Sequence, residues 1–193
     1  MIDVVKLQRR LAVAPDGDCG PATMRALFAR CAAPATIASE LGLAAAVHFR
    51  GAGILESERR LAHAMAQLGH ESDGFRAMEE YASGSAYEGR ADLGNTQPGD
   101  GRRYKGRGPI QVTGRANYRR YGRILGIDLE QRPELASAPS IGLMVSCAYW
   151  TDRGLNALAD RDDLEAVTRK INGGVNGLAD RAKRLAAMKI LLA

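Results

Sequence analysis

The chain has 193 residues, of which 46% are hydrophobic and 25% charged, and these values exclude a globally disordered or collagen-like protein. No stretch reaches the roughly 18 uncharged apolar residues of a membrane helix, and the low aromatic content favours helices over a β-sandwich. The net charge of +5 suits either a protein that meets polyanions or one whose basic residues only cover helix surfaces.

Near the N-terminus, apolar residues recur at helical spacing in two short segments, which predicts two short helices. The first covers residues 4–11 and the second begins at Pro21. Proline fits the first turn of a helix because its missing N–H needs no partner there. Two short helices bury little surface alone, so this unit is expected to dock on its neighbour. We predict a short helical unit at residues 1–33 and a larger domain at residues 34–193.

The larger domain is predicted to be mainly α-helical, with at most a small β element. Its expected helices are 36–49, Ser57–His70, 114–125, one capped by Ser140, one capped by Asp162, and Leu178–Leu192. Residues 81–109 lack periodicity and are rich in glycine, which is typical of a functional loop. The only strand candidate is 110–112.

No metal or other cofactor is predicted. His63 and His70 lie seven residues apart but lack a third ligand, and the three cysteines match no zinc pattern. We interpret Cys19, Cys31 and Cys147 as reduced thiols of a chain made in the cytoplasm, with a Cys19–Cys31 bridge as a minor alternative. The first residues show no secretory signal.

Carboxylates are the remaining candidates for catalysis. Glu71 ends an apolar helix, and Glu79, Glu80 and Glu88 follow it into the loop region. Hydrolysis of a sugar–sugar bond needs two carboxyl groups, one that protonates the leaving oxygen and one that activates water or balances positive charge. On one continuous helix Glu71 and Glu80 would face opposite sides, about 13 Å apart along the axis. The hypothesis therefore predicts a break near Asp73–Gly74, whereas the alternative is that the later glutamates are only solvated.

Four separated blocks resemble glycoside hydrolase family 19, which includes plant chitinases and many phage endolysins. The blocks are His70–Phe75, Glu79–Tyr81, the run from Gly99 to Tyr118 that contains RYKGRGPIQVTG, and Ile171–Gly174. The first and third blocks resemble the endolysin branch most closely. The resemblance implies a lysozyme-like, two-lobed helical domain with a substrate cleft.

The resemblance also implies roles for individual residues. Glu71 matches the general acid, and Glu80, nine residues later, matches the second carboxylate of the endolysin branch. Glu88 is the rival for this second role, because the chitinase branch takes its base from a later loop residue. Thr113 matches the hydroxyl residue that holds the attacking water. The implied sugar-binding residues are Tyr104, Gln111, Asn117, Tyr118 and Asn172.

Residues 7–27 resemble more weakly the helical modules that bind peptidoglycan, at about half the length of such a module. Two basic stretches, 99–123 with eight basic residues against one acidic and 169–193 with six against one, would suit an anionic wall or outer-membrane surface.

We therefore expect a monomeric, endolysin-like hydrolase of β-1,4 bonds in peptidoglycan, with no nucleic acid partner, that acts on the wall from the periplasm after release. The alternatives are a chitinase acting on N-acetylglucosamine polymers and a non-catalytic protein that binds cell wall or nucleic acid.

Overall fold

The computed structural model describes residues 1–193 as ten α-helices and four short 3-10 helices, without a β-sheet. The α-helices are α1 (Val4–Arg10), α2 (Pro21–Arg30), α3 (Ala35–Gly51), α4 (Glu58–Glu71), α5 (Asp100–Arg103), α6 (Arg115–Leu125), α7 (Pro139–Asp152), α8 (Leu155–Asp160), α9 (Leu164–Asn172) and α10 (Leu178–Leu192). No helix combines the length and the apolar character needed to cross a membrane. The three cysteines are all free thiols.

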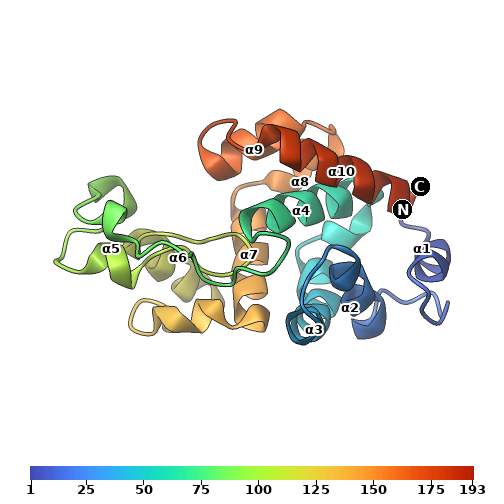
Figure 1. Cartoon of the computed structure of the whole chain (residues 1–193), viewed down its shortest axis with the longest axis horizontal. Coiled ribbons are helices and arrows are strands. Elements are labelled where there is room, and N and C mark those ends of the chain that lie inside the picture. The colour runs from blue at the N-terminus through green and yellow to red at the C-terminus, as the bar shows by residue number, and fades with distance from the viewer.

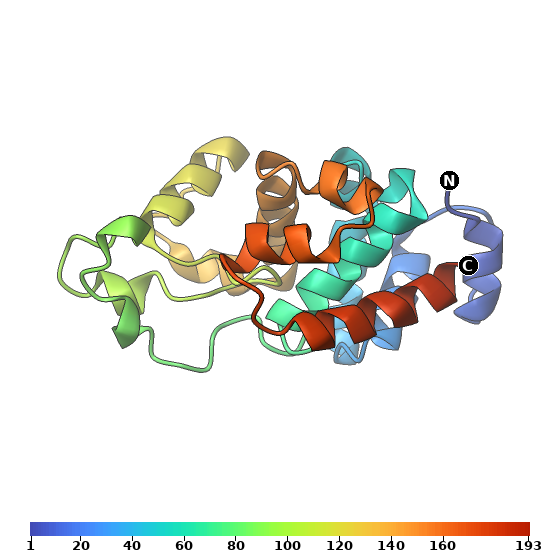
Figure 2. The same cartoon turned by 90° about the horizontal axis from the view of Figure 1, so that it is seen from above.

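Two lobes flank α7 (Figure 1). The large lobe contains α1–α4 and α8–α10, and the small lobe, residues 79–137, contains α5, α6 and long connecting loops (Figures 1 and 2). The mainly helical, two-lobed fold is confirmed. The predicted strand at 110–112 is absent, since Arg107 forms only isolated bridges, one with Glu79 and one with Val112.

Two predicted helix caps are wrong by one or two residues. Ser140 lies inside the first turn of α7, because the helix begins at Pro139, which is pre-shaped for that position. The cap of α9 is Asp163, whose side chain accepts a hydrogen bond from a first-turn N–H. Asp162 instead hydrogen-bonds with the ring of His63, 2.8 Å away.

The chain breaks sharply after Glu71, which is the last residue of α4. Three successive residues, Asp73, Gly74 and Phe75, have positive φ angles of 51°, 66° and 64°, and no α-helix continues through that conformation. The Ser72 hydroxyl donates to a carbonyl of α4 and accepts the N–H of Phe75, which holds the turn. The predicted break between the two candidate carboxylates is therefore present.

A single hydrophobic core runs across the predicted boundary at residue 33. The cluster of 39 buried residues contains side chains of α1 and α2 together with those of the later helices. Phe28 packs edge-on against Phe75 with 4.9 Å between ring centroids. A Cβ on Gly42 would lie 2.7 Å from the backbone N of Arg25, so α2 and α3 cross in near contact. The first helical unit is thus docked on the large lobe, next to the turn that follows Glu71.

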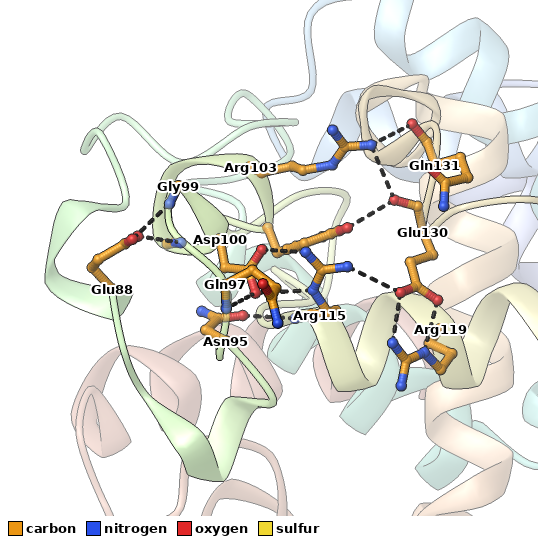
Figure 3. Close-up of polar contacts among 12 residues, drawn as sticks. Glu88, Asn95, Gln97, Gly99, Asp100, Arg103, Arg115, Arg119, Glu130 and Gln131 are labelled. Atoms are coloured by element: carbon orange, nitrogen blue, oxygen red, sulfur yellow. Dashed lines mark hydrogen bonds and ion pairs between the residues drawn. The ribbon is translucent and has the colours of Figure 1, made fainter.

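Ion pairs hold the small lobe together (Figure 3). Arg115 donates from Nε to the buried Asp100 at 2.9 Å and from Nη1 to Glu130 at 3.2 Å, while Arg119 Nε donates to Glu130 at 2.7 Å. Of the eight basic residues in 99–123, only Arg102 and Arg123 lack a hydrogen-bonding or ion-pair partner within the protein. This basic stretch is therefore mostly an internal network and not a free cationic surface.

Phe28→Ala is expected to lower the free energy of unfolding by about 3–5 kcal/mol, because it leaves a cavity between α2 and the turn after α4. Urea denaturation measures the change. Leu43→Ala, at a position of α3 that is 62% exposed, is the control and should change stability by no more than about 0.5 kcal/mol. Similar effects for the two variants would contradict the packing described.

The small-lobe network predicts a loss of stability in acid. The hydrogen bond from Arg115 lowers the pKa of Asp100 and outweighs the opposing effect of burial. Arg119, aided by Arg115 and opposed in part by burial, lowers the pKa of Glu130 from 4.5 to about 2. Folding favours the ionised carboxylates, so their stabilisation is complete above about pH 4.5 and is lost as the pH falls towards about 2.

Melting temperatures recorded across this pH range test the expectation. Glu130→Gln should flatten the curve, because its side chain no longer takes up a proton. Glu40→Gln, which removes an exposed carboxylate without an ion-pair partner, should keep the slope of the unmodified protein. A Glu130→Gln curve as steep as that of Glu40→Gln would exclude the network as the cause.

Candidate active site

A cleft of about 610 Å³ is lined by both lobes and by α7. The large lobe contributes Glu71 and the end of α9, and the small lobe contributes residues between 87 and 113 together with Asn117 of α6. Five of the predicted site residues lie in its wall, namely Glu71, Gln111, Thr113, Asn117 and Asn172. Segments that are 100 residues apart in sequence therefore meet at one cleft.

Glu71 is held by a fully buried arginine of α10. Arg181 Nη2 donates to Glu71 Oε1 at 2.5 Å, and the same guanidinium also donates to the side chain of Gln67 and to the carbonyl of Asn176. A buried guanidinium is tolerated only when it is paired and hydrogen-bonded in this way. The pair fixes one carboxylate oxygen of Glu71 and leaves Oε2 without a protein partner, on a residue that lines the cleft.

Glu80 lies on the small lobe, where two donors orient its carboxylate. The Tyr87 hydroxyl donates to Oε1 at 3.0 Å, and the backbone N–H of Gly106 donates to Oε2 at 3.1 Å. Glu80 itself is not part of the cleft wall, but Tyr87 and Thr113 are.

The absent side chain of Gly106 opens a small space beside Glu80. A Cβ there would lie 3.3 Å from Glu80 Oε2, 3.4 Å from Thr113 Oγ1 and 2.7 Å from Gln111 Oε1. Three oxygens from three side chains thus border the same space. A water lying near these oxygens would have acceptors for both of its protons.

Glu88, the rival second carboxylate, is exposed and has both oxygens engaged. The backbone N–H of Gly99 donates to Oε1 at 2.6 Å, and that of Gly101 donates to Oε2 at 2.8 Å (Figure 3). Glu88 does not line the cleft. Its position indicates that it holds the loop at the start of α5, whereas Glu80 neighbours the cleft residues Tyr87 and Thr113.

Three of the predicted sugar-binding residues are in the cleft wall. Gln111 has a positive φ of 54°, and its amide group donates to the carbonyls of Ala77 and Gly108. Asn117 donates to the Thr113 carbonyl at 2.7 Å, which leaves its side-chain oxygen as an acceptor. Asn172 is exposed at the end of α9.

The other two predicted sugar-binding residues are buried in the small lobe. The Tyr104 hydroxyl donates to the carbonyl of Glu130 at 2.9 Å, and the Tyr118 hydroxyl donates to the carbonyl of Lys105 at 2.7 Å. Burial, opposed in part by Arg107, raises the pKa of Tyr118 to about 12. Neither tyrosine lines the cleft, so this placement differs from the expected contact with sugar, and the two rings instead support the loop behind it.

Sequence reasoning missed Arg181, Tyr87 and Tyr149 as site residues. A signal for Arg181 was available, because it occupies the inward stripe of the last helix at helical spacing. That buried stripe consists of Arg181, Leu185, Met188 and Leu192. A charged residue in such a stripe requires a buried partner.

The sequence matches the family described as chitinase class I, glycoside hydrolase family 19, over residues 28–159. A family 19 domain-containing protein of Haemophilus influenzae is 37% identical over 116 residues, which are 60% of this chain and 56% of that protein. The endochitinase At2g43610 of Arabidopsis thaliana is 33% identical over 145 residues, which are 75% of this chain and 50% of that protein. The chain thus spans about half the length of these curated relatives.

Solved structures share the fold. A bacterial family 19 chitinase superposes with a TM-score of 0.62 at 21% identity. The superposition covers 100% of this chain and 95% of the chitinase chain. A class IV family 19 chitinase of Zea mays superposes with a TM-score of 0.65 at 23% identity over 80% of each chain. From the family match over most of its length, this chain belongs to glycoside hydrolase family 19.

Proposed function

We propose that this protein is an endolysin-like hydrolase that cleaves β-1,4 glycosidic bonds of bacterial peptidoglycan by acid–base catalysis. The observation that carries the proposal is the placement of two carboxylates beside one cleft, Glu71 on the large lobe and Glu80 on the small lobe. Membership of a glycoside hydrolase family supports the reaction class. In this proposal the protein acts on the wall from the periplasm.

Glu71 is the general acid. Arg181 holds Oε1, so Oε2 is the oxygen that carries the proton and faces no competing partner in the protein. The proton passes to the glycosidic oxygen as the bond between that oxygen and the anomeric carbon breaks. The departing sugar leaves with a new hydroxyl, and Glu71 becomes a carboxylate beside the guanidinium.

Glu80 is the general base. A water in the space beside Gly106 donates to Glu80 Oε2 and to Thr113 Oγ1, whose own proton is directed to the Gln111 carbonyl at 2.9 Å. The water oxygen attacks the anomeric carbon from the face opposite the leaving group, and its proton moves to Glu80. This is the inverting route, in which the second carboxylate activates water and forms no bond to sugar.

The charge of the cleft favours peptidoglycan over chitin. Four cationic side chains, Arg90, Arg153, Arg169 and Lys170, line it against one acidic side chain, Glu71. Arg90 and Arg169 form ion pairs with neighbouring carboxylates, so Arg153 and Lys170 supply the unpaired positive charge. Chitin is uncharged and offers no partner to these cations, whereas the glycan of the wall carries carboxylates on its lactyl-linked peptides. The proposal does not depend on the first helical unit, because residues that carry its wall-binding resemblance, such as Leu7, Gln8 and Leu27, are buried.

Chitin is the second candidate substrate. Several relatives carry the name endochitinase, and the amide and hydroxyl groups of the cleft suit N-acetyl sugars in either polymer.

Glu71→Gln is expected to lower kcat on sacculi by about 10²–10⁴-fold, because the amide retains an oxygen for Arg181 but has no proton to give. Turbidity loss of outer-membrane-stripped cells measures the rate, and mass spectrometry of the digest identifies the new reducing end. Circular dichroism checks that the variant is folded. Retention of more than about a tenth of the activity would remove Glu71 from this role, and cleavage of chitin oligomers alone would identify a chitinase.

Glu80→Gln and Glu88→Gln should separate the two rival carboxylates. The first is expected to lose about 100-fold or more in kcat, because the attacking water loses its base. The second should keep kcat within a few fold and lower the melting temperature, because it weakens the hydrogen bonds to the loop at Gly99 and Gly101. The reverse ranking in kcat would give the role to Glu88.

A further inference from the structure

We propose that Arg153 and Lys170 form a carboxylate-binding subsite in the cleft, which makes the enzyme prefer glycans that carry carboxylate groups over neutral ones. The inference rests on the proposed function in taking this cleft as the glycan site. It goes further because it names the two residues that bind the carboxylate groups of the substrate.

Only two of the four cations in the cleft wall, Arg153 and Lys170, have no carboxylate within ion-pair distance. Arg90 is paired with Asp92 at 2.6 Å, and Arg169 is paired with Glu165 at 2.8 Å. No carboxylate oxygen lies within 4.0 Å of the charged nitrogens of Arg153 or Lys170. An anionic group of a bound glycan would therefore meet these two side chains without first displacing a carboxylate. The side chain beside the Arg153 guanidinium is the neutral hydroxyl of Tyr121.

One tyrosine supports both of these cations. The Arg153 guanidinium lies over the ring of Tyr149, 5.1 Å from its centroid. The single proton of the Tyr149 hydroxyl is shared between the backbone carbonyls of Lys170 and Ile171, each 3.4 Å away. A guanidinium stacked on an aromatic ring keeps its N–H edge available for a planar carboxylate. Tyr149 thus fixes the face of Arg153 and the backbone at Lys170 together.

The subsite lies close to the catalytic acid. Burial is the main cause that raises the pKa of Tyr149, and the negative charge of Glu71 adds to it, which places the two side chains within electrostatic reach. All four residues line the same cleft. A carboxylate carried on a sugar bound next to the scissile bond would therefore meet Arg153 and Lys170 while that bond lies beside Glu71.

The test compares two soluble polymers with the same backbone, carboxymethyl chitin and neutral glycol chitin. We expect the ratio of kcat/KM for the anionic polymer over the neutral one to fall about tenfold in R153Q/K170Q, since each exposed ion pair contributes a few fold. The matched control is R123Q/R161Q, which removes two exposed cations outside the cleft. Its ratio should stay within twofold of that of the unmodified enzyme.

An unchanged ratio in R153Q/K170Q would overturn the inference, and so would an equal fall in the control, because that fall would reflect net charge alone. If only wall glycan is cleaved, sacculi before and after amidation of their carboxylates replace the two polymers. A substrate ratio that depends on Arg153 and Lys170 without cleavage of sacculi would keep the subsite and reject peptidoglycan. Cleavage of sacculi without any dependence on Arg153 and Lys170 would keep the peptidoglycan proposal and reject the subsite.

Discussion

The buried ion pair between Arg181 and Glu71 is the interaction on which the rest of the site depends. A guanidinium in the core needs partners for its N–H groups, and Arg181 of α10 finds them in the side-chain oxygens of Glu71 and Gln67 of α4. Gln67 in turn donates to Thr168 of α9. Three helices are thereby fixed around one carboxylate, and the two that come last in the chain lie outside the matched family region.

A second constraint is the abrupt end of α4. The positive φ angles at Asp73 and Phe75 cost free energy in non-glycine residues, and such strain persists only where surrounding contacts impose it. Here the imposed contact is apolar, because Phe75 is buried against Phe28 of α2. The first helices of the chain thus help to determine where the second carboxylate goes, although they provide no catalytic group.

The sequence predicts most of the helices well because a 3.6-residue apolar period reports directly which face is buried. It also places Glu71 at a helix end and requires the break that brings Glu80 back. Periodicity does not report which partner a buried group meets, and this explains the missed role of Arg181. The same limit applies to Tyr104 and Tyr118, whose motif suggested contact with sugar although their hydroxyls bind backbone carbonyls. The basic stretch at 99–123 suggested a surface because charge counts ignore long-range pairs such as Arg115–Asp100.

Both chain ends lie at the pole of the large lobe opposite α5 (Figures 1 and 2). Arg10 of α1 donates to the backbone carbonyls of Ile190 and Leu191, which lie in the last turn of α10 and have no partner within the helix. A domain fused to either end would therefore emerge from the same pole of the large lobe, far from the small lobe. Because α10 carries Arg181, tension applied to the C-terminal end would act along the helix whose arginine holds Glu71.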